Sequence, residues 1–213
     1  MASTRSVPHY RDDMLRRAYV EDPESGVIPL ARVLNARGLD LVGTEHAARH
    51  FAEAAFALTS VIENYGATQS RVRHLVTALA NEAHASAFSG DYGWTDLARA
   101  LDAAESAVRW QRRHLASLAD PSRDTPAEVS EDESATLAGL LLTLARVQAA
   151  CALMDEVRVT YGEAARLVGL GGDHEEWREV AASVASEIGV VEPGTSDYVD
   201  PEHRTRRWFS YRR

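Results

Sequence analysis

Three side chains that could bind a metal ion follow one another at helical spacing near residue 50. His46, His50 and Glu53 are four and three residues apart, so a helix would place them on one face, and Glu45 adjoins them. Imidazole and carboxylate groups are common ligands of zinc, and metal-binding bundles direct such ligands inward. At about 100° per residue, however, this face lies roughly 130° from the apolar stripe of the same segment. The spacing therefore favours a solvated polar face, and we expect no metal and no cofactor.

The chain has one cysteine, Cys151, in a segment rich in leucine and alanine. One cysteine excludes an internal disulfide framework. A thiol on the apolar side of a helix has a raised pKa and is inert, and no neighbouring base in the sequence could activate it. The chain also contains no phosphate-binding glycine motif, no G-x-S-x-G and no H-E-x-x-H. These observations favour a protein that is not an enzyme.

Trp110 stands among the basic residues Arg109, Arg112, Arg113 and His114. A helix over this segment places the tryptophan opposite the apolar stripe. A large aromatic side chain among arginines outside the core can anchor a partner protein. Alternatively, the ring packs against the C-terminal helices of its own chain. Trp110 and Arg113 are the candidate partner-binding residues.

The C-terminal third contains two short helices that are predicted from their first residues. Thr160 and Glu163 form a capping box, which predicts that a helix begins there and runs to Gly169. After a glycine-rich turn, Asp173 and Glu176 open another helix. Helix, short turn and helix is the arrangement that helix-turn-helix proteins use to place a second helix on DNA. We therefore expect a helix-turn-helix-like segment over residues 160–188.

Three stretches of this region resemble motifs of the alkylguanine-DNA alkyltransferase family and its non-catalytic alkyltransferase-like relatives. Residues 159–169, VTYGEAARLVG, resemble the family segment V-S/T-Y-G-E-L-A-x-L-x-G, and residues 177–181, WREVA, are similar to A-R-A-V-G. Residues 201–204, PEHR, resemble the active-site motif P-C-H-R. In this family a winged helix-turn-helix binds the DNA minor groove, and an arginine of the recognition helix enters the base stack. The resemblance implies that role for Arg178. It also implies that alkyl transfer is lost, because Glu202 stands in place of the nucleophilic cysteine.

The last ten residues, 204–213, read RTRRWFSYRR and contain five arginines and no acidic residue. Arginine pairs with phosphate, and aromatic rings stack on bases or insert between base steps. Alternatively, Trp208 and Phe209 dock on the core while the arginines meet the excess carboxylates of a chain whose net charge is −9. Together with the resemblance, this gives the candidate DNA-binding residues Thr160, Tyr161, Arg166, Trp177, Arg178, His203, Arg204, Arg206, Arg207 and Trp208.

The elements that must position these residues are predicted to be helical throughout, with no strand-like alternation. Helices are expected over residues 10–19, 28–37, 44–65, 70–88 and 95–118, with a turn at 22–26, Gly38 as a C-terminal stop and Thr95 as an N-cap. Apolar stripes are expected at helical spacing. In four segments they comprise Phe51, Ala55, Leu58, Ile62 and Tyr65; Val72, Leu75, Val76, Leu79 and Ala83; Leu97, Leu101, Ala104, Val108 and Leu115; and Leu137, Leu140, Leu141, Leu144, Val147, Cys151 and Met154.

This organisation predicts an all-α protein, with a helical bundle followed by a helix-turn-helix-like C-terminal module. The bundle is expected over residues 1–120, an acidic linker over 121–133, and a helical module over 134–213 that ends in the basic aromatic tail 204–213. The linker is recognised from two prolines and six acidic residues between positions 120 and 133, with a single arginine.

The composition excludes several classes of protein. The chain has 213 residues, of which 45% are hydrophobic and 26% charged, and this excludes collagen-like, mucin-like and wholly disordered proteins. No run approaches the roughly 20 apolar residues of a membrane helix, and the polar N-terminus lacks a signal peptide, so we expect a cytoplasmic protein. The leading hypothesis is a non-enzymatic regulator or adaptor whose bundle self-associates, for example as a dimer, or binds a protein, and whose C-terminal module binds DNA. The alternatives are a protein–protein adaptor without nucleic-acid binding and a metal-dependent bundle enzyme.

Overall fold

The computed structural model describes residues 7–88, 96–120, 131–170 and 182–186. These residues are almost entirely α-helical and contain no β-strand, which confirms the predicted all-α class. The chain divides into two compact units, Met1–Ser130 and Glu131–Arg213. Within the described residues, every helix falls short of the length and hydropathy that crossing a membrane would require.

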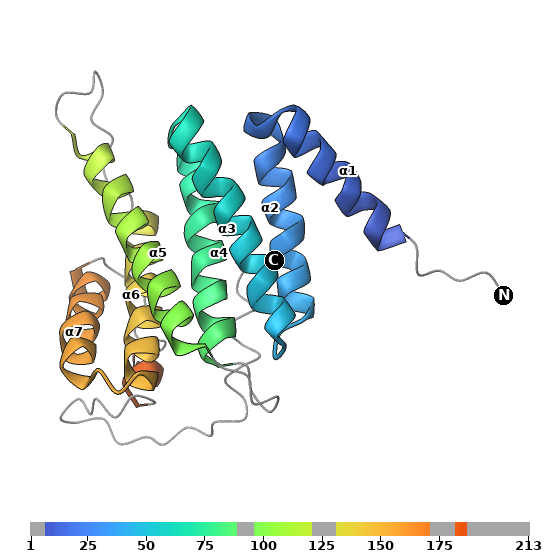
Figure 1. Cartoon of the computed structure of the whole chain (residues 1–213). Helices are drawn as coiled ribbons and strands as arrows, with labels where there is room; N and C mark the ends of the chain where they lie inside the picture. The colour runs from blue at the N-terminus through green and yellow to red at the C-terminus, as the bar shows by residue number, and fades with distance from the viewer. Residues whose placement is uncertain (1–6, 89–95, 121–130, 171–181, 187–213) are drawn as a thin grey trace. The chain divides into compact units, whose positions relative to one another are not determined.

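The first unit is a series of helices in which each packs against the next (Figure 1). The helices are α1 (Val7–Glu21), α2 (Pro23–Asp40), α3 (Glu45–Tyr65), α4 (Gln69–Ala87) and α5 (Leu97–Leu118). In addition to these sequential contacts, α2 touches α4. Helix α3 therefore packs into the angle between α2 and α4, and the face of α3 that points away from both is the outer one.

The boundary between α1 and α2 consists of a single residue, Asp22, so the predicted turn over residues 22–26 is wrong. The Asp22 carboxylate accepts a hydrogen bond from the backbone N–H of Ser25 at 3.2 Å, and this bonding lowers the pKa of Asp22. Pro23 occupies the first helical position, where its fixed φ and missing N–H favour a helix start. The two helices come so close here that a Cβ atom on Gly26 would lie 2.6 Å from the Cα atom of Tyr19.

Gly38 is buried inside α2 and does not end it, contrary to the prediction. The ring of Phe51 on α3 lies against the glycine so closely that any Cβ atom there would overlap its ring carbons. Phe51 is fully buried, and it forms an apolar cluster with Ala47, Ala48 and Ala85. Gly38 therefore allows close packing between α2 and α3 and does not act as a helix stop.

The other helix boundaries of this unit follow from local capping. Gly66 has φ of +89°, a conformation that glycine adopts without steric cost, and it ends α3 as predicted. The Thr68 hydroxyl accepts a hydrogen bond from the N–H of Arg71 and begins α4. Asp96, and not Thr95, caps α5, since its carboxylate accepts from the N–H of Arg99 at 3.1 Å.

The predicted stripes of α3 and α4 are buried with few exceptions, whereas that of α5 is displaced. Tyr65 is half exposed, because it lies in the last turn of α3. On α5, Leu97, Leu101 and Leu115 are only half-buried. The residues of α5 that are buried share one face of small and polar side chains: Ala100, Ala103, Ala104, Ala107, Val108, Gln111 and His114.

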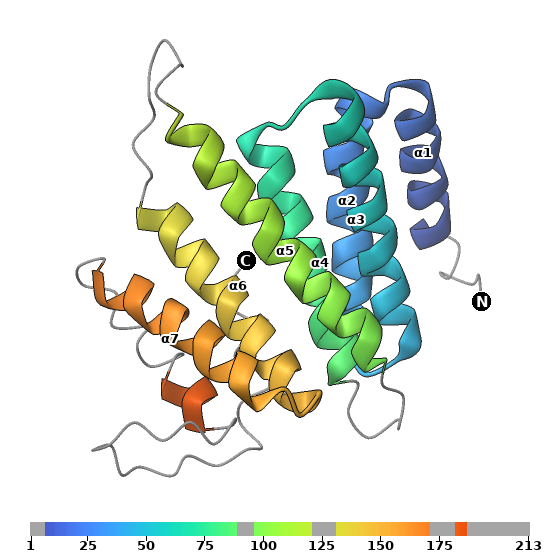
Figure 2. The same cartoon turned by 60° about the vertical axis from the view of Figure 1, so that its left-hand side comes forward.

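The second unit contains α6 (Glu131–Ala150) and α7 (Met154–Leu170), which pack against each other (Figure 2). Residues 182–186 are also helical. Helix α6 begins within the segment predicted as a linker, and its leucine-rich stripe is buried as far as Val147. A short turn at Cys151, with Ala152 at φ of 59°, leads into α7. Cys151 is only half-buried and Met154 is exposed, so the predicted stripe does not extend past the turn.

Helix α7 begins six residues before the predicted start at Thr160. Thr160 is buried in the middle of α7, so it does not cap a helix. In the turn after α6, backbone N–H groups donate to the oxygens of Val147, Gln148 and Ala149. Helix α7 begins directly after this turn, at Met154. The capping-box pattern at Thr160 and Glu163 thus arose by coincidence within a continuous helix.

Candidate functional site

The candidate metal ligands His46, His50 and Glu53 lie on a partly exposed face of α3. The Glu53 carboxylate forms a two-point ion pair with Arg16 of α1, and both side chains are partly exposed. His46 is exposed and His50 is half-buried. Within the described residues, no three His, Cys, Asp or Glu side chains gather closely enough to hold a metal ion. The face that carries these three residues points away from the core, in agreement with the helical arithmetic.

A buried charged pair joins the end of α4 to the start of α5. The Nε atom of Arg99 donates to a carboxylate oxygen of Glu82 at 2.7 Å, and Nη2 donates to the backbone oxygen of Ala48 on α3 at 3.3 Å. The Glu82 side chain is 10% exposed and that of Arg99 is 31% exposed. Burial raises the pKa of Glu82, and the hydrogen bond and charge of Arg99 partly oppose this shift. The pair connects three helices.

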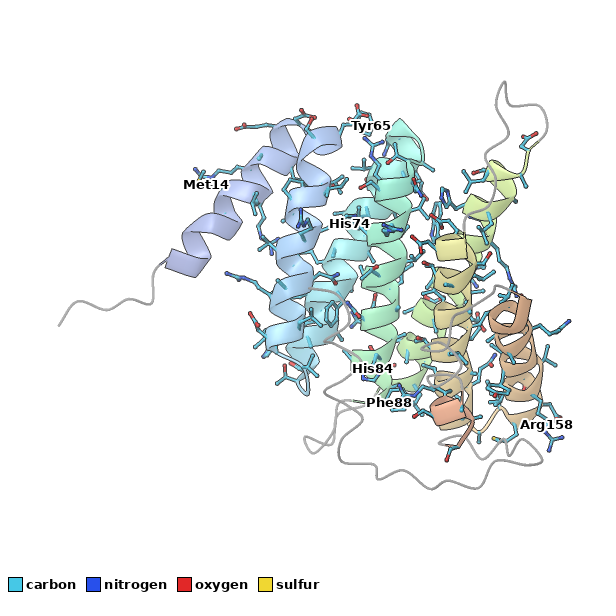
Figure 3. The ribbon with its side chains drawn as sticks, turned by 180° about the vertical axis from the view of Figure 1, so that it is seen from behind. Met14, Tyr65, His74, His84, Phe88 and Arg158 are labelled. Carbon is cyan, nitrogen blue, oxygen red and sulfur yellow. The ribbon has the colours of Figure 1, made fainter. Side chains whose placement is uncertain are left out.

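Next to this pair, the last turn of α4 buries polar side chains that helical periodicity did not identify. His84 is buried, although it is not part of the predicted stripe of this helix, and its ring centroid lies 5.2 Å from that of Phe88 (Figure 3). Ser86 is fully buried, and none of the described residues forms a hydrogen bond with its hydroxyl. The sequence gives no signal for this burial, because the residues lie where α4 meets the cluster around Phe51.

A second charged group lies at the other end of α4. The Arg71 side chain is 7% exposed and donates to the backbone oxygens of Tyr65 and Gly66, at 3.4 and 3.0 Å. It also donates to a carboxylate oxygen of Glu24 on α2 at 2.7 Å. The guanidinium group therefore satisfies carbonyl oxygens at the end of α3 that have no partner within that helix.

Trp110 and Arg113, the candidate partner-binding residues, are adjacent on α5. The guanidinium carbon of Arg113 lies 5.6 Å from the centroid of the Trp110 ring, within range of a cation–π contact. Arg113 is exposed and Trp110 is half-buried. Arg109, in contrast, is held by Glu105 and Ser106. The leucine stripe predicted that Trp110 lies opposite the buried face of α5. Because the buried face is the one that carries the alanines, Trp110 lies at its edge instead.

The predicted DNA-binding residues are described only in part. Thr160 and Tyr161 are buried in the second unit, and Arg166 is exposed, with its Nε atom donating to the Gly162 oxygen at 3.0 Å. The remaining candidates lie outside the described residues: Trp177, Arg178, His203, Arg204, Arg206, Arg207 and Trp208. Arg158, which sequence reasoning missed, is also exposed on α7, on the outer side of the helix (Figure 3).

Cys151 lies in the turn between α6 and α7. Desolvation raises the pKa of its thiol, in the direction expected from the sequence. A raised pKa reduces the thiolate fraction near neutral pH, which lowers the nucleophilicity of the sulfur.

Comparisons of the chain with protein-family models, curated proteins and solved structures found no significant match.

Proposed function

We propose that this is a non-enzymatic DNA-binding protein whose second unit contacts the phosphate backbone, while the first unit acts as a helical bundle for assembly. The observation that carries the proposal is the gathering of five arginines and three aromatic rings in the last ten residues of a chain with a net charge of −9. An acidic chain repels polyanions as a whole, so a segment of opposite charge is the part suited to bind one.

The outer face of α7 supports this proposal. Arg158, Gly162 and Arg166 are four residues apart and so form a line on the helix surface. Both arginines are exposed, and a Cβ atom at Gly162 would meet no atom within 4 Å. Two cations on either side of an unobstructed glycine leave room for a phosphate backbone to approach.

Acidic residues limit how much α7 can contribute alone. Asp155 and Glu156 are exposed in its first turn, and Glu163 is half-buried further along. Because these carboxylates repel phosphates, we propose that the tail supplies most of the affinity and α7 a smaller part. In the same proposal α7 is the first helix of a helix-turn-helix, residues 182–186 belong to the second, and Arg178 enters the base stack, as the resemblance implies.

The test is a fluorescence anisotropy titration of the full-length protein with a labelled DNA duplex at 50 and 200 mM salt. The test variant replaces Arg204, Arg206, Arg207, Arg212 and Arg213 by serine, and a second carries Arg158→Ser and Arg166→Ser. Arg32→Ser, at an exposed position on α2, is the control for loss of a charge.

We expect the native protein to bind more weakly as salt rises, because the release of counterions from the DNA is less favourable at a higher salt concentration. The five-arginine variant should lose at least about tenfold in affinity, the two-arginine variant less, and Arg32→Ser nothing. Arg178→Ala should weaken binding with little change in the salt slope, since it is proposed to contact bases. Equal, negligible binding by the native protein and the five-arginine variant would overturn the proposal.

The Trp110–Arg113 contact favours a second candidate function, a protein–protein adaptor without nucleic-acid binding. An aromatic ring at the edge of a buried face, covered by an exposed arginine, has the composition of an interface hot spot. Capture of one stoichiometric protein by the native chain, but not by Trp110→Ala, together with absent DNA binding, would support this candidate over the first.

A further inference from the structure

Phe56 is the most exposed large apolar side chain among the described residues, at 77% of its surface. It lies in the middle of α3 and is exposed, whereas Phe51, Leu58 and Ile62 on the packed side of the same helix are buried. The helices that pack against α3 are α2 and α4, and Figure 1 shows α3 crossing in front of α4. An exposed phenylalanine in the middle of a long helix leaves a substantial apolar area in water, which contact with another surface would remove. We propose that the face of α3 that carries Phe56 binds the same face of a second copy of the chain, with the two α3 helices antiparallel and Phe56 on the two-fold axis.

The side chains next to Phe56 on this face are small. Ala52 and Ser60 lie one turn before and one turn after it, each about 40° away around the helix axis at 100° per residue. Small residues let two helices approach closely, so that a protruding ring on each can pack beside the other. The Arg16–Glu53 ion pair at the edge of the face fixes α1 to α3 and leaves Phe56 uncovered.

The charges on this face identify a second copy as the partner. Arg49 and Glu63 are each seven residues from Phe56, one toward each end of α3, and both are exposed. Seven residues make two turns, so each charge lies about 10.5 Å along the axis from Phe56 and close to the same line. An antiparallel two-fold places residue 56 + n of one chain opposite residue 56 − n of the other. Arg49 of each copy therefore meets Glu63 of the partner copy.

This complementarity depends on the orientation of the two helices. A parallel arrangement would bring Arg49 to Arg49 and Glu63 to Glu63, and both contacts would be repulsive. A two-fold dimer uses the same patch on both chains, and such a patch must be complementary to itself. The outer face of α3 satisfies this condition through one arginine, one glutamate and a central aromatic ring. Within each chain Arg49 also pairs with Glu45 at 3.1 Å, one turn away, and so lies between two carboxylates in the dimer.

Self-association through α3 rests on the assembly role proposed for the first unit and specifies it. It is tested separately from DNA binding, because it involves only this helix and is measured without nucleic acid. A contact made by one helix from each chain is small, so we expect a reversible dimer whose population rises with concentration. The experiment is sedimentation equilibrium of the full-length protein over a wide concentration range. The variant Phe56→Glu tests the central contact. Val159→Glu is the matched control, because Val159 is also exposed, at 70%, but lies on α7 of the other unit.

We expect the native protein and Val159→Glu to dimerise equally, and Phe56→Glu to lose at least about tenfold in the association constant, because two carboxylates would meet on the axis. Circular dichroism of Phe56→Glu checks that the variant is folded, which its exposed position favours. A native protein that stays monomeric up to millimolar concentration would overturn the proposal. So would a dimer that Phe56→Glu leaves intact.

Charge reversal tests the antiparallel orientation independently of Phe56. Arg49→Glu alone and Glu63→Arg alone each create two like-charge contacts, so each variant should dimerise more weakly than the native protein. A mixture of the two variants should form a heterodimer. In it, the glutamate introduced in the first variant would meet the arginine introduced in the second, and the unchanged Glu63 of the first would meet the unchanged Arg49 of the second. Failure of the mixture to associate better than either variant alone would overturn the two-fold arrangement.

Discussion

The two ends of α4 each hold a charged pair between helices, and the pairs differ in which partner is buried. At the start of α4 the cation is buried: Arg71 is 7% exposed and its partner Glu24 is 55% exposed. Toward the end of α4 the anion is buried: Glu82 is 10% exposed and its partner Arg99 is 31% exposed. A carboxylate can take up a proton and become neutral, whereas arginine keeps its charge in proteins. The two pairs should therefore respond differently to pH and to the loss of a partner.

The largest effect is expected for Arg99→Met, which leaves Glu82 buried without its cation. Breaking a buried pair from one side lowers the free energy of unfolding by about 3 kcal/mol or more when the remaining group stays charged. Protonation of Glu82 relieves this penalty, so the loss should be larger at pH 8 than at pH 5. Urea denaturation at the two pH values measures it. The double variant Glu82→Gln with Arg99→Met should recover much of the loss, and an equal loss at both pH values would contradict the explanation.

A smaller, pH-independent effect is expected for Arg71→Met at the other end of α4. The variant removes donors to the oxygens of Tyr65 and Gly66 but leaves Glu24 exposed to water. Loss of hydrogen bonds from a charged group should lower the free energy of unfolding by about 2 kcal/mol. The same urea experiment should show a similar loss at pH 5 and pH 8. A loss of stability that differs strongly between pH 5 and pH 8 would contradict this explanation.

Glu82→Gln should change stability by only about 1 kcal/mol, because the amide oxygen can still accept from Arg99. Its main effect should be on pH dependence. The pKa of Glu82 is raised in the folded protein above its ordinary value of 4.5. Its contribution to stability is therefore complete below the unfolded pKa and is lost as pH rises through the folded pKa. The native protein should lose stability relative to Glu82→Gln as pH rises from about 4.5, and a difference that stays constant with pH would contradict the raised pKa.

The smallest effect is expected for Glu24→Gln. The glutamate is more than half exposed, and surface pairs contribute about 0–1 kcal/mol. Arg71 keeps its two carbonyl acceptors, so its charge is not left without partners. Thermal unfolding with and without 0.5 M salt should show a difference from the native protein that shrinks with salt. A loss as large as that of Arg71→Met would mean that Glu24 carries most of the stabilisation at this end.

Helical periodicity predicted much of the fold because the core of this protein is mostly built from amphipathic stripes. Phe51, Leu58 and Ile62 on α3 were expected in the core and are buried there. Periodicity failed where the buried face is small or polar. On α5 it followed the leucines, whereas the packed face carries alanines, Gln111 and His114. Periodicity indicates an apolar direction, but it cannot show that a neighbouring helix approaches along a line of alanines.

Local signals failed where distant residues decide the outcome. Gly38 has the pattern of a helix stop, yet the ring of Phe51, thirteen residues later, makes it a position of close packing. Glu82 and Arg99 are seventeen residues apart, and neither shows its partner in the sequence. Thr160 and Tyr161 were candidate DNA-binding residues from local sequence patterns, and both are buried in the second unit.

The contact between Gly38 and Phe51 also sets the alignment of α2 and α3 along their lengths. A ring that rests in the notch left by a missing side chain cannot move up or down the helix, because the neighbouring positions on α2 carry a Cβ atom. Sliding α2 by one turn would put Leu34 in the place of the glycine, against the ring, and force the helix axes apart. The missing Cβ atom of Gly38 therefore fixes the position of α3 along the axis of α2. It thereby also fixes the position of the outer face of α3 relative to the rest of the unit.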